Sequence, residues 1–285
     1  MLSPYISKPK RLLTQLEIDD TSVPACASYC AGFEFKAWRC ESFADHLIEW
    51  IADYALKEDE LRVDHVNMYI RLREAAARVY RSENYKKRGE VGEIVLHAIC
   101  RDFFNTVPFA PRVFYLTSSN DVVKSFDLVH VRDLPGGGFE LWLGEAKFYT
   151  SAIDGIKAAI ESVAAHIDQG FLQNEKLLLG PQVSKSLPHY QEIRDLLSVQ
   201  VSLDDLFKNA VFPICIACDS KATQSNEAFS DAYTEAVGAE LSALVCRLQE
   251  SGLTEKIRIM LIYVPLGSKE KLADAFDDRL KGLCP

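Results

Sequence analysis

The sequence has no long hydrophobic run, because no stretch approaches the roughly 18 consecutive apolar residues that a membrane-spanning helix requires. Its first residues, MLSPYISKPKRLL, contain no apolar segment followed by a small-residue cleavage site, so no secretory signal is expected. Internal repeats and low-complexity segments are also absent. These absences argue against a membrane or secreted protein, and they predict a cytoplasmic one.

The positions of the cysteines argue against a zinc site. The eight cysteines are spread along the chain, and only Cys215 and Cys218 form a C-x-x-C pair. This pair lies in the apolar segment VFPICIAC, which is typical of a buried strand, and residues three apart on a strand point to opposite faces. No second C-x-x-C follows. We therefore expect buried thiols in a reducing compartment rather than metal ligands.

The chain also lacks the basic excess with which many proteins hold nucleic acid. Its formal net charge is −9 at pH 7, so any nucleic-acid binding must come from a local patch, from metal ions or from a partner. Residues 71–88 form one such patch, with seven Lys and Arg residues against two Glu residues. The patch is either a solvated helix face or an edge that contacts phosphates. Its last residues are our candidate nucleic-acid contacts: Lys86, Lys87 and Arg88.

The composition is otherwise that of a globular protein. Hydrophobic residues make up 48% and charged residues 26% of the 285 residues, which allows one large domain or a domain with an appendage. Residues 1–40 are expected to be irregular, and amphipathic helices are predicted near residues 42–56 and 59–80. We therefore divide the chain into an N-terminal helical appendage, residues 1–80, and a second domain, residues 81–285.

In the second domain, a predicted helix over residues 89–104 precedes strands near residues 111–116, 126–131 and 139–148. Helices predicted after residue 153, at 224–250 and at 269–280 alternate with buried strands at 211–218 and 257–264. This order predicts an α/β fold with a mixed central sheet that is flanked by helices on both faces.

The most informative stretch is a predicted β-hairpin, SFDLVHVRDLPGGGFELWLGEAKFY, closed by a glycine-rich turn. Alternation places Glu145 and Lys147 on one face of the second strand. If Arg132 lies opposite Phe139 or Glu140, then Asp127 lies opposite Gly144 or Glu145. Two facing carboxylates repel each other unless a divalent cation binds both. The alternative is that these charged residues face water, as isolated Glu and Lys residues usually do.

The helix before the hairpin, GEVGEIVLHAICRDFF, carries a polar stripe on an otherwise apolar surface. At about 100° per residue, Glu90, Glu93, His97 and Arg101 share one face. Apolar residues on both flanks suggest that most of the circumference is buried, so the stripe is either a surface face or the wall of a polar cavity. We interpret His97 as a hydrogen-bonded structural residue and not as a metal ligand.

Together these residues resemble the PD-(D/E)xK nuclease superfamily, which has an acid on one strand, (D/E)-x-K on the hairpin partner and a Glu on the preceding helix. Asp127, the segment Glu145-Ala146-Lys147 and Glu93, with Glu90 as its rival, stand at those places. The combination of RGEVGE, SFDLVHV and WLGEAKFY with a later helix carrying Ser162 and His166 is similar to the HamA family, the nuclease subunits of Hachiman anti-phage defence systems. The likeness spans about residues 85–265.

The resemblance implies a restriction-endonuclease-like core and an endodeoxyribonuclease that depends on Mg²⁺ or Mn²⁺. It implies that Asp127, Glu145 and the carbonyl of Ala146 bind the metal, and that Glu93 binds a second ion or a metal-bound water. Lys147 would orient the attacking water or stabilise the transition state. The implied partner is a superfamily-2 helicase similar to HamB, which restrains the nuclease until DNA engages it. The residues leave open a catalytically silent DNA-binding or regulatory subunit, a nuclease that acts on RNA, and a structural protein.

Overall fold

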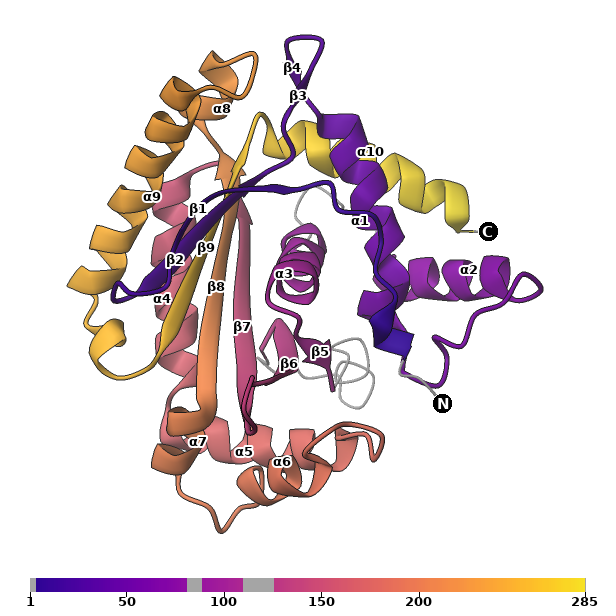
Figure 1. Ribbon diagram of the computed structural model, residues 1–285, viewed down its shortest axis with the longest axis vertical. Coiled ribbons are helices and arrows are strands. Elements are labelled where there is room, and N and C mark those ends of the chain that lie inside the picture. Colours follow the sequence, from indigo (N-terminus) through magenta and orange to yellow (C-terminus); the bar gives the residue numbers. More distant parts are fainter. Residues whose placement is uncertain (1–3, 81–88, 110–125, 285) are drawn as a thin grey trace.

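The computed structural model describes residues 4–80, 89–109 and 126–284 (Figure 1). Its main sheet has seven strands in the order β1-β2-β9-β8-β7-β6-β5. The three central pairings, β2–β9, β9–β8 and β8–β7, are parallel, whereas β1–β2, β7–β6 and β6–β5 are antiparallel. The predicted mixed central sheet is therefore confirmed.

The strands of the main sheet are β1 (Thr14–Asp19), β2 (Ala25–Cys30), β5 (Val107–Pro108), β6 (Leu128–Asp133), β7 (Phe139–Tyr149), β8 (Ala210–Asp219) and β9 (Ile259–Leu266). A small hairpin, β3 (Phe33–Glu34) and β4 (Ala37–Trp38), stands apart from it. Strands β8 and β9 are buried along almost their whole length. Burial on both faces explains their continuous apolar sequences, because helices cover a parallel sheet on each side.

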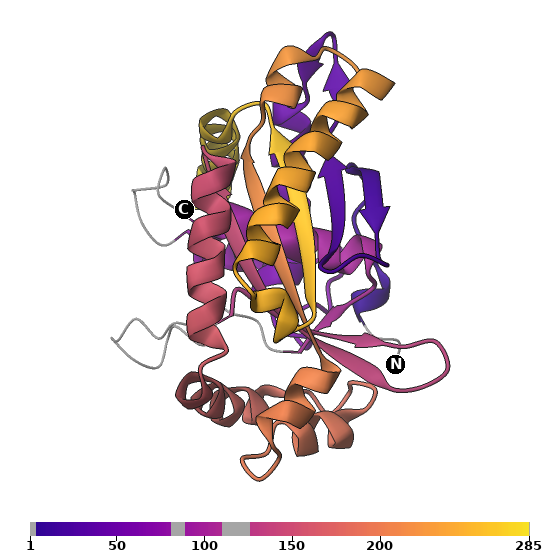
Figure 2. The same cartoon turned by 90° about the vertical axis from the view of Figure 1, so that its left-hand side faces the viewer.

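Helices cover both faces of the sheet (Figures 1 and 2). One face packs against α1 (Cys40–Ala55), α2 (Met68–Val79), α3 (Glu90–Phe103) and α10 (Lys269–Leu283), which form one core cluster with inward residues of β7, β8 and β9. The other face carries α4 (Ala152–His166), α5 (Gln169–Leu179), α6 (Tyr190–Leu196), α7 (Leu203–Asn209) and α9 (Asp231–Glu250) in a second cluster. The short helix α8 (Lys221–Ser225) follows β8, and 3₁₀ turns occur at Pro4–Ile6, Gly180–Gln182 and Leu253–Glu255.

Serine residues fix where several of these helices begin. Helices α4, α7, α8, α9 and α10 each follow a serine whose hydroxyl accepts the backbone N–H three residues later. Such an N-cap stabilises a helix by about 1 kcal/mol. The caps are Ser151, Ser202, Ser220, Ser230 and Ser268.

The N-terminal part of the chain differs from expectation. Residues 1–40 were expected to be irregular, but they supply β1 and β2 of the main sheet, and α1 shares a core cluster with α3. Residues on both sides of the expected boundary at residue 80 thus contribute strands to one sheet and side chains to one core cluster. The predicted helix at 59–80 begins only at Met68, because Asp64 accepts the N–H groups of Val66 and Asn67 in a local turn.

Two further expectations have clear outcomes. Cys215 lies in the first core cluster and Cys218 in the second, so the two thiols point to opposite faces of β8 as predicted. None of the helices in the described part of the chain has the length and apolar character needed to cross a membrane. The strand predicted at 111–116 lies outside the described residues.

Candidate active site

The hairpin forms with the expected register. Arg132 lies opposite Glu140, and Leu128 lies opposite Gly144. In the turn, the Leu134 N–H donates to the Gly138 carbonyl at 3.0 Å. Residues 136–138 have φ values of 96°, 101° and 90°, which explains the run of three glycines, because other residues rarely adopt positive φ. The turn thereby sets which residues of β6 and β7 face each other.

Asp127 is bound to the other strand of the hairpin through its backbone and its side chain. Its N–H donates to the Gly144 carbonyl at 2.8 Å, and its carboxylate Oδ2 accepts the N–H of Ala146 at 2.8 Å. The residue is 9% exposed. Asp127 lies directly before β6, so its carboxylate provides the acceptor that a longer β6 would have offered to Ala146. The predicted acid is therefore held beside the Glu-Ala-Lys segment.

Glu145 and Lys147 share one face of β7, as the alternation predicts, and this face is covered by α4. The Lys147 Cβ lies against Gly155 of α4. The Lys147 Nζ forms an ion pair with Glu145 Oε1, and both side chains are largely withdrawn from water. The alternative that Glu145 and Lys147 both face water is therefore wrong. Buried charges of this kind are costly unless they are paired or bind a cation.

The structure adds His166, which had been noted in the family pattern without a role. It lies at the end of α4, and its Nδ1 is 3.4 Å from Glu145 Oε2. Both side chains are buried, and the ring of Phe126 packs at 4.9 Å from the imidazole. Only its spacing of four residues after Ser162 marked this histidine in the sequence.

Glu93 reaches the hairpin region from the other side of the sheet. Helix α3 packs closely on β7 at Gly92, where a Cβ would lie 3.0 Å from the Phe148 Cβ and 3.7 Å from the Ala146 Cβ. Glu93 is 9% exposed, and its Oε2 accepts the hydroxyl hydrogen of Tyr54 at 2.5 Å. Ala146 is thus the place where Asp127 and the first turn of α3 approach β7.

The polar stripe of α3 is buried rather than exposed. His97 Nε2 lies 2.7 Å from Asp53 Oδ1 of α1, and His97 Nδ1 lies 3.2 Å from His130 Nε2 of β6. Thr106 Oγ1 lies 2.7 Å from His130 Nδ1, and Arg101 joins Asp53 to the Thr106 carbonyl. The prediction that His97 is a hydrogen-bonded structural residue is therefore confirmed, and α3 is buried around most of its circumference.

Burial determines the protonation of this network. It lowers the pKa of His97 and of His130 below the usual value, so both imidazoles are neutral at pH 7. Burial alone would raise the pKa of Asp53, but contacts with His97 and Arg101 outweigh burial and lower it. Asp53 and Arg101 are therefore the charged members of the network.

The fit to a divalent cation rests on Asp127 and Glu145. Among the residues that the structure describes, no group of three or more His, Cys, Asp and Glu side chains is arranged to hold a metal ion. However, Glu145 Oε2 is fully buried, and apart from the contact with His166 Nδ1 at 3.4 Å it makes no hydrogen bond with any described residue. A buried carboxylate oxygen of this kind suits a hard cation, and so does a second carboxylate beside it. The candidate nucleic-acid contacts Lys86, Lys87 and Arg88 lie outside the described residues.

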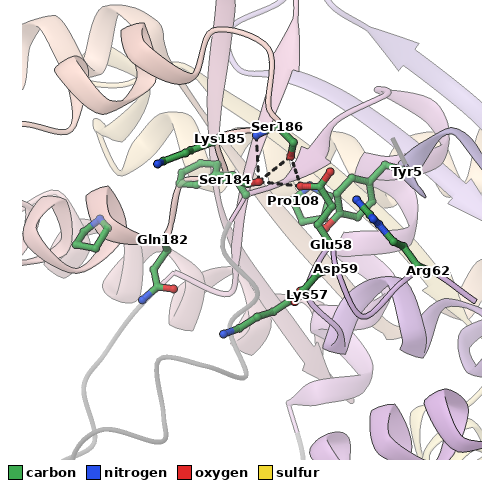
Figure 3. A pocket seen from close by; sticks show the side chains of 12 residues that line it. Tyr5, Lys57, Glu58, Asp59, Arg62, Pro108, Gln182, Ser184, Lys185 and Ser186 are labelled. Atoms are coloured by element: carbon green, nitrogen blue, oxygen red, sulfur yellow. Dashed lines mark hydrogen bonds between the residues drawn. The ribbon is translucent and has the colours of Figure 1, made fainter. Parts of the chain in front are cut away.

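A pocket of about 460 Å³ lies elsewhere, between the segment after α1, strand β5 and the segment after α5 (Figure 3). Within it, Ser184 and Ser186 both donate hydrogen bonds to Glu58 Oε2. None of the predicted site residues lines this pocket. It is therefore separate from the candidate active site.

The mixed sheet with helices on both faces makes this an α/β protein. Its candidate site lies on the hairpin, where Asp127 is held beside the Glu-Ala-Lys segment. The family model of HamA matches residues 9–280, and the chain belongs to the HamA family. Membership of this family indicates a role in anti-phage defence of the Hachiman type. No curated protein and no solved structure matches the chain.

Proposed function

We propose that this chain is the metal-dependent nuclease subunit of an anti-phage defence complex, and that it hydrolyses DNA phosphodiesters. The observation that carries the proposal is the hydrogen bond from the Ala146 N–H to Asp127, which fixes an acid beside Glu145 and Lys147. An acid paired with Glu-x-Lys on a hairpin is the arrangement of the PD-(D/E)xK nucleases. HamA family membership supports the defence role.

Each residue has a defined task in this proposal. Asp127, Glu145 and the Ala146 carbonyl would hold Mg²⁺ or Mn²⁺, and Glu93 would bind a second ion or a coordinated water. When bound, such an ion lowers the pKa of a water molecule and offsets phosphate charge. The ammonium group of Lys147 forms an ion pair with Glu145. From this position it would orient the attacking water or stabilise the charge of the transition state.

The proposed partner is a superfamily-2 helicase that restrains the nuclease until DNA engages the complex. A net charge of −9 supports this arrangement, because a chain with this charge repels nucleic acid at long range. The helicase would then supply much of the grip on DNA. Lys86, Lys87 and Arg88 are the proposed local contacts of the nuclease itself.

The test measures cleavage by the full chain, with and without the helicase, in Mg²⁺, in Mn²⁺ and in a chelator. Glu145→Ala and Lys147→Ala should each lower the cleavage rate by a factor on the order of 10³ or more, because these groups act on the transition state. Lys157→Ala and Glu161→Ala, on the exposed face of α4, are the matched controls. Cleavage at the wild-type rate in both site variants would contradict the proposal.

The same experiment separates the two other functions. A catalytically silent DNA-binding or regulatory subunit predicts no metal-dependent cleavage, together with DNA affinity that falls when Lys86, Lys87 and Arg88 are replaced by Ala. An RNA nuclease predicts cleavage of a single-stranded RNA of the same sequence in preference to DNA. Circular dichroism of each variant distinguishes loss of activity from loss of fold.

A further inference from the structure

Helices α1 and α3 are joined by polar contacts at two neighbouring positions. The Tyr54 hydroxyl donates to Glu93 Oε2 at 2.5 Å, and Asp53 Oδ1 lies 2.7 Å from His97 Nε2. Glu93 and His97 are one helical turn apart, so the two contacts lie side by side along α3. Asp53 also binds Arg101, a further turn along, at 2.9 Å. This ladder fixes the rotation of α3 relative to α1.

The tyrosine ring has little freedom to leave Glu93. Tyr54 is 7% exposed, and its ring meets the His97 imidazole edge to face with centroids 5.6 Å apart. His97 is itself held by Asp53 and by His130. The hydroxyl is therefore aimed at one carboxylate oxygen of Glu93 by side chains that are themselves hydrogen-bonded.

A hydrogen bond to a carboxylate that serves a metal orients the ligand, and its loss typically costs about 10–100-fold in metal affinity or activity. Glu93 Oε1, the oxygen that Tyr54 does not bind, points back along α3 towards Gly89. The first turn of α3 is the turn that packs on Ala146 through Gly92. The hydrogen bond from Tyr54 to Oε2 therefore also fixes the direction in which Oε1 of Glu93 points.

We propose that Tyr54 is the positioning residue for Glu93, and that this contact makes Glu93, rather than Glu90, the acid that α3 contributes to the metal site. The inference rests on the proposed function, because it gives Glu93 a metal-linked task. The proposal gives α1 a role in the active site, although none of the family motifs lies in this helix.

The test replaces Tyr54 by Phe in the full chain, which removes the hydroxyl and keeps the ring. The Kd for Mn²⁺ alone, measured by titration calorimetry, and the Mn²⁺ concentration for half-maximal cleavage should each rise 10–100-fold. Tyr29→Phe is the matched control, because Tyr29 lies in the same core cluster and its buried hydroxyl makes no hydrogen bond with any described residue. Both variants should unfold at similar temperatures.

A second comparison separates positioning from a general effect on packing. In a Glu93→Ala background, Tyr54→Phe should change the Mn²⁺ affinity less than twofold, because the carboxylate that accepts from the hydroxyl is already absent. If Tyr54→Phe and Tyr29→Phe bind Mn²⁺ equally well while Glu145→Ala is inactive, the positioning role is wrong and the nuclease proposal stands. If Glu145→Ala cleaves like the wild type, the nuclease proposal itself fails.

Discussion

Asp127 accepts a hydrogen bond at 2.8 Å from the backbone N–H of Ala146, a residue 19 positions later on the other strand of the hairpin. The carboxylate thus continues the hydrogen bonding between β6 and β7 beyond the first residue of β6. This contact has a consequence for charge as well as for geometry, since it holds an anionic group beside Glu145 in a buried place.

Replacement of Asp127 by Asn should separate these two roles. The amide oxygen of Asn can still accept the Ala146 N–H, so the fold should be retained, but the negative charge is lost. We expect the Mn²⁺ affinity to fall by at least about tenfold, because carboxylate charge is what a hard cation requires. Titration calorimetry measures this directly. Asp133→Asn, at the exposed opposite end of β6, is the control.

Asp127→Ala removes the acceptor as well as the charge. A buried N–H left without an acceptor costs about 1–3 kcal/mol, so this variant should be less stable than Asp127→Asn by about that amount in urea unfolding. Equal stability of the two variants would show that the Asp127–Ala146 hydrogen bond does not stabilise the hairpin.

Gly92 allows α3 to approach β7. A Cβ at this position would lie 3.0 Å from the Phe148 Cβ and 3.4 Å from its backbone nitrogen. Although alanine favours a helix over glycine by about 1 kcal/mol, the close contact should reverse the sign for Gly92→Ala. We expect a net loss of about 1–3 kcal/mol in the free energy of unfolding, together with reduced cleavage, because α3 must move away from Ala146.

Gly282→Ala is the matched substitution in a helix with open space. A Cβ there meets no atom within 4 Å, so only the helix preference remains and the variant should be as stable as the wild type or more so. Urea unfolding of both variants provides the comparison. A Gly92→Ala protein as stable as Gly282→Ala would show that the α3–β7 contact is less tight than described.

The buried histidines predict how stability depends on pH. Burial lowers the pKa of His97 and His130 in the folded protein, whereas the unfolded chain protonates them near pH 6.5. Below about pH 6.5 the unfolded state binds more protons, so the free energy of unfolding should decrease as the pH falls. Above that pH both states are neutral at these residues, and they contribute no pH dependence.

His130→Asn tests this assignment in urea unfolding at pH 7.5, 6.5 and 5.5. The variant should be less stable than the wild type at pH 7.5. The difference in stability should narrow at pH 5.5, because the unfolded variant can no longer take up a proton at residue 130. His65→Asn, at an exposed position, should follow the wild type at every pH. A constant difference between His130→Asn and the wild type would contradict the assignment.

Thiol reactivity provides a further check on the fold. Of the eight cysteines, Cys246 is exposed, Cys40 and Cys284 are half-buried, and the remaining five are buried. Burial raises the pKa of Cys40 to about 11 and that of Cys218 to about 12, and only the thiolate reacts quickly. A disulfide reagent at pH 8 should therefore show one rapid equivalent that Cys246→Ser removes. All eight thiols should react in denaturant.

Local sequence patterns predicted the hairpin and its register. Strand alternation has a period of two, and three successive glycines fix the turn, so Arg132 faces Glu140 and Asp127 falls beside the Glu-Ala-Lys segment. The helical period likewise predicted that α3 is buried around most of its circumference. These features follow from residues close together in the chain.

Long-range pairing explains what the sequence did not reveal. Strand β2 joins the main sheet by pairing with β9, so that Ala25 faces Met260, and no local pattern encodes a partner so distant. Strand β1 is mostly exposed and lacks a clear apolar alternation. Residues 1–40 therefore seemed irregular when considered alone.

The sequence by itself determined which residues carry charge within apolar segments: Glu93 on a helix, and Asp127, Glu145 and Lys147 on a hairpin. Only the tertiary structure decided which side chains surround them. Tyr54 meets Glu93 across 39 residues, and His166 approaches Glu145 from the end of α4. Such contacts depend on how helices pack on the two faces of the sheet, and that packing is set by the whole core rather than by neighbouring residues.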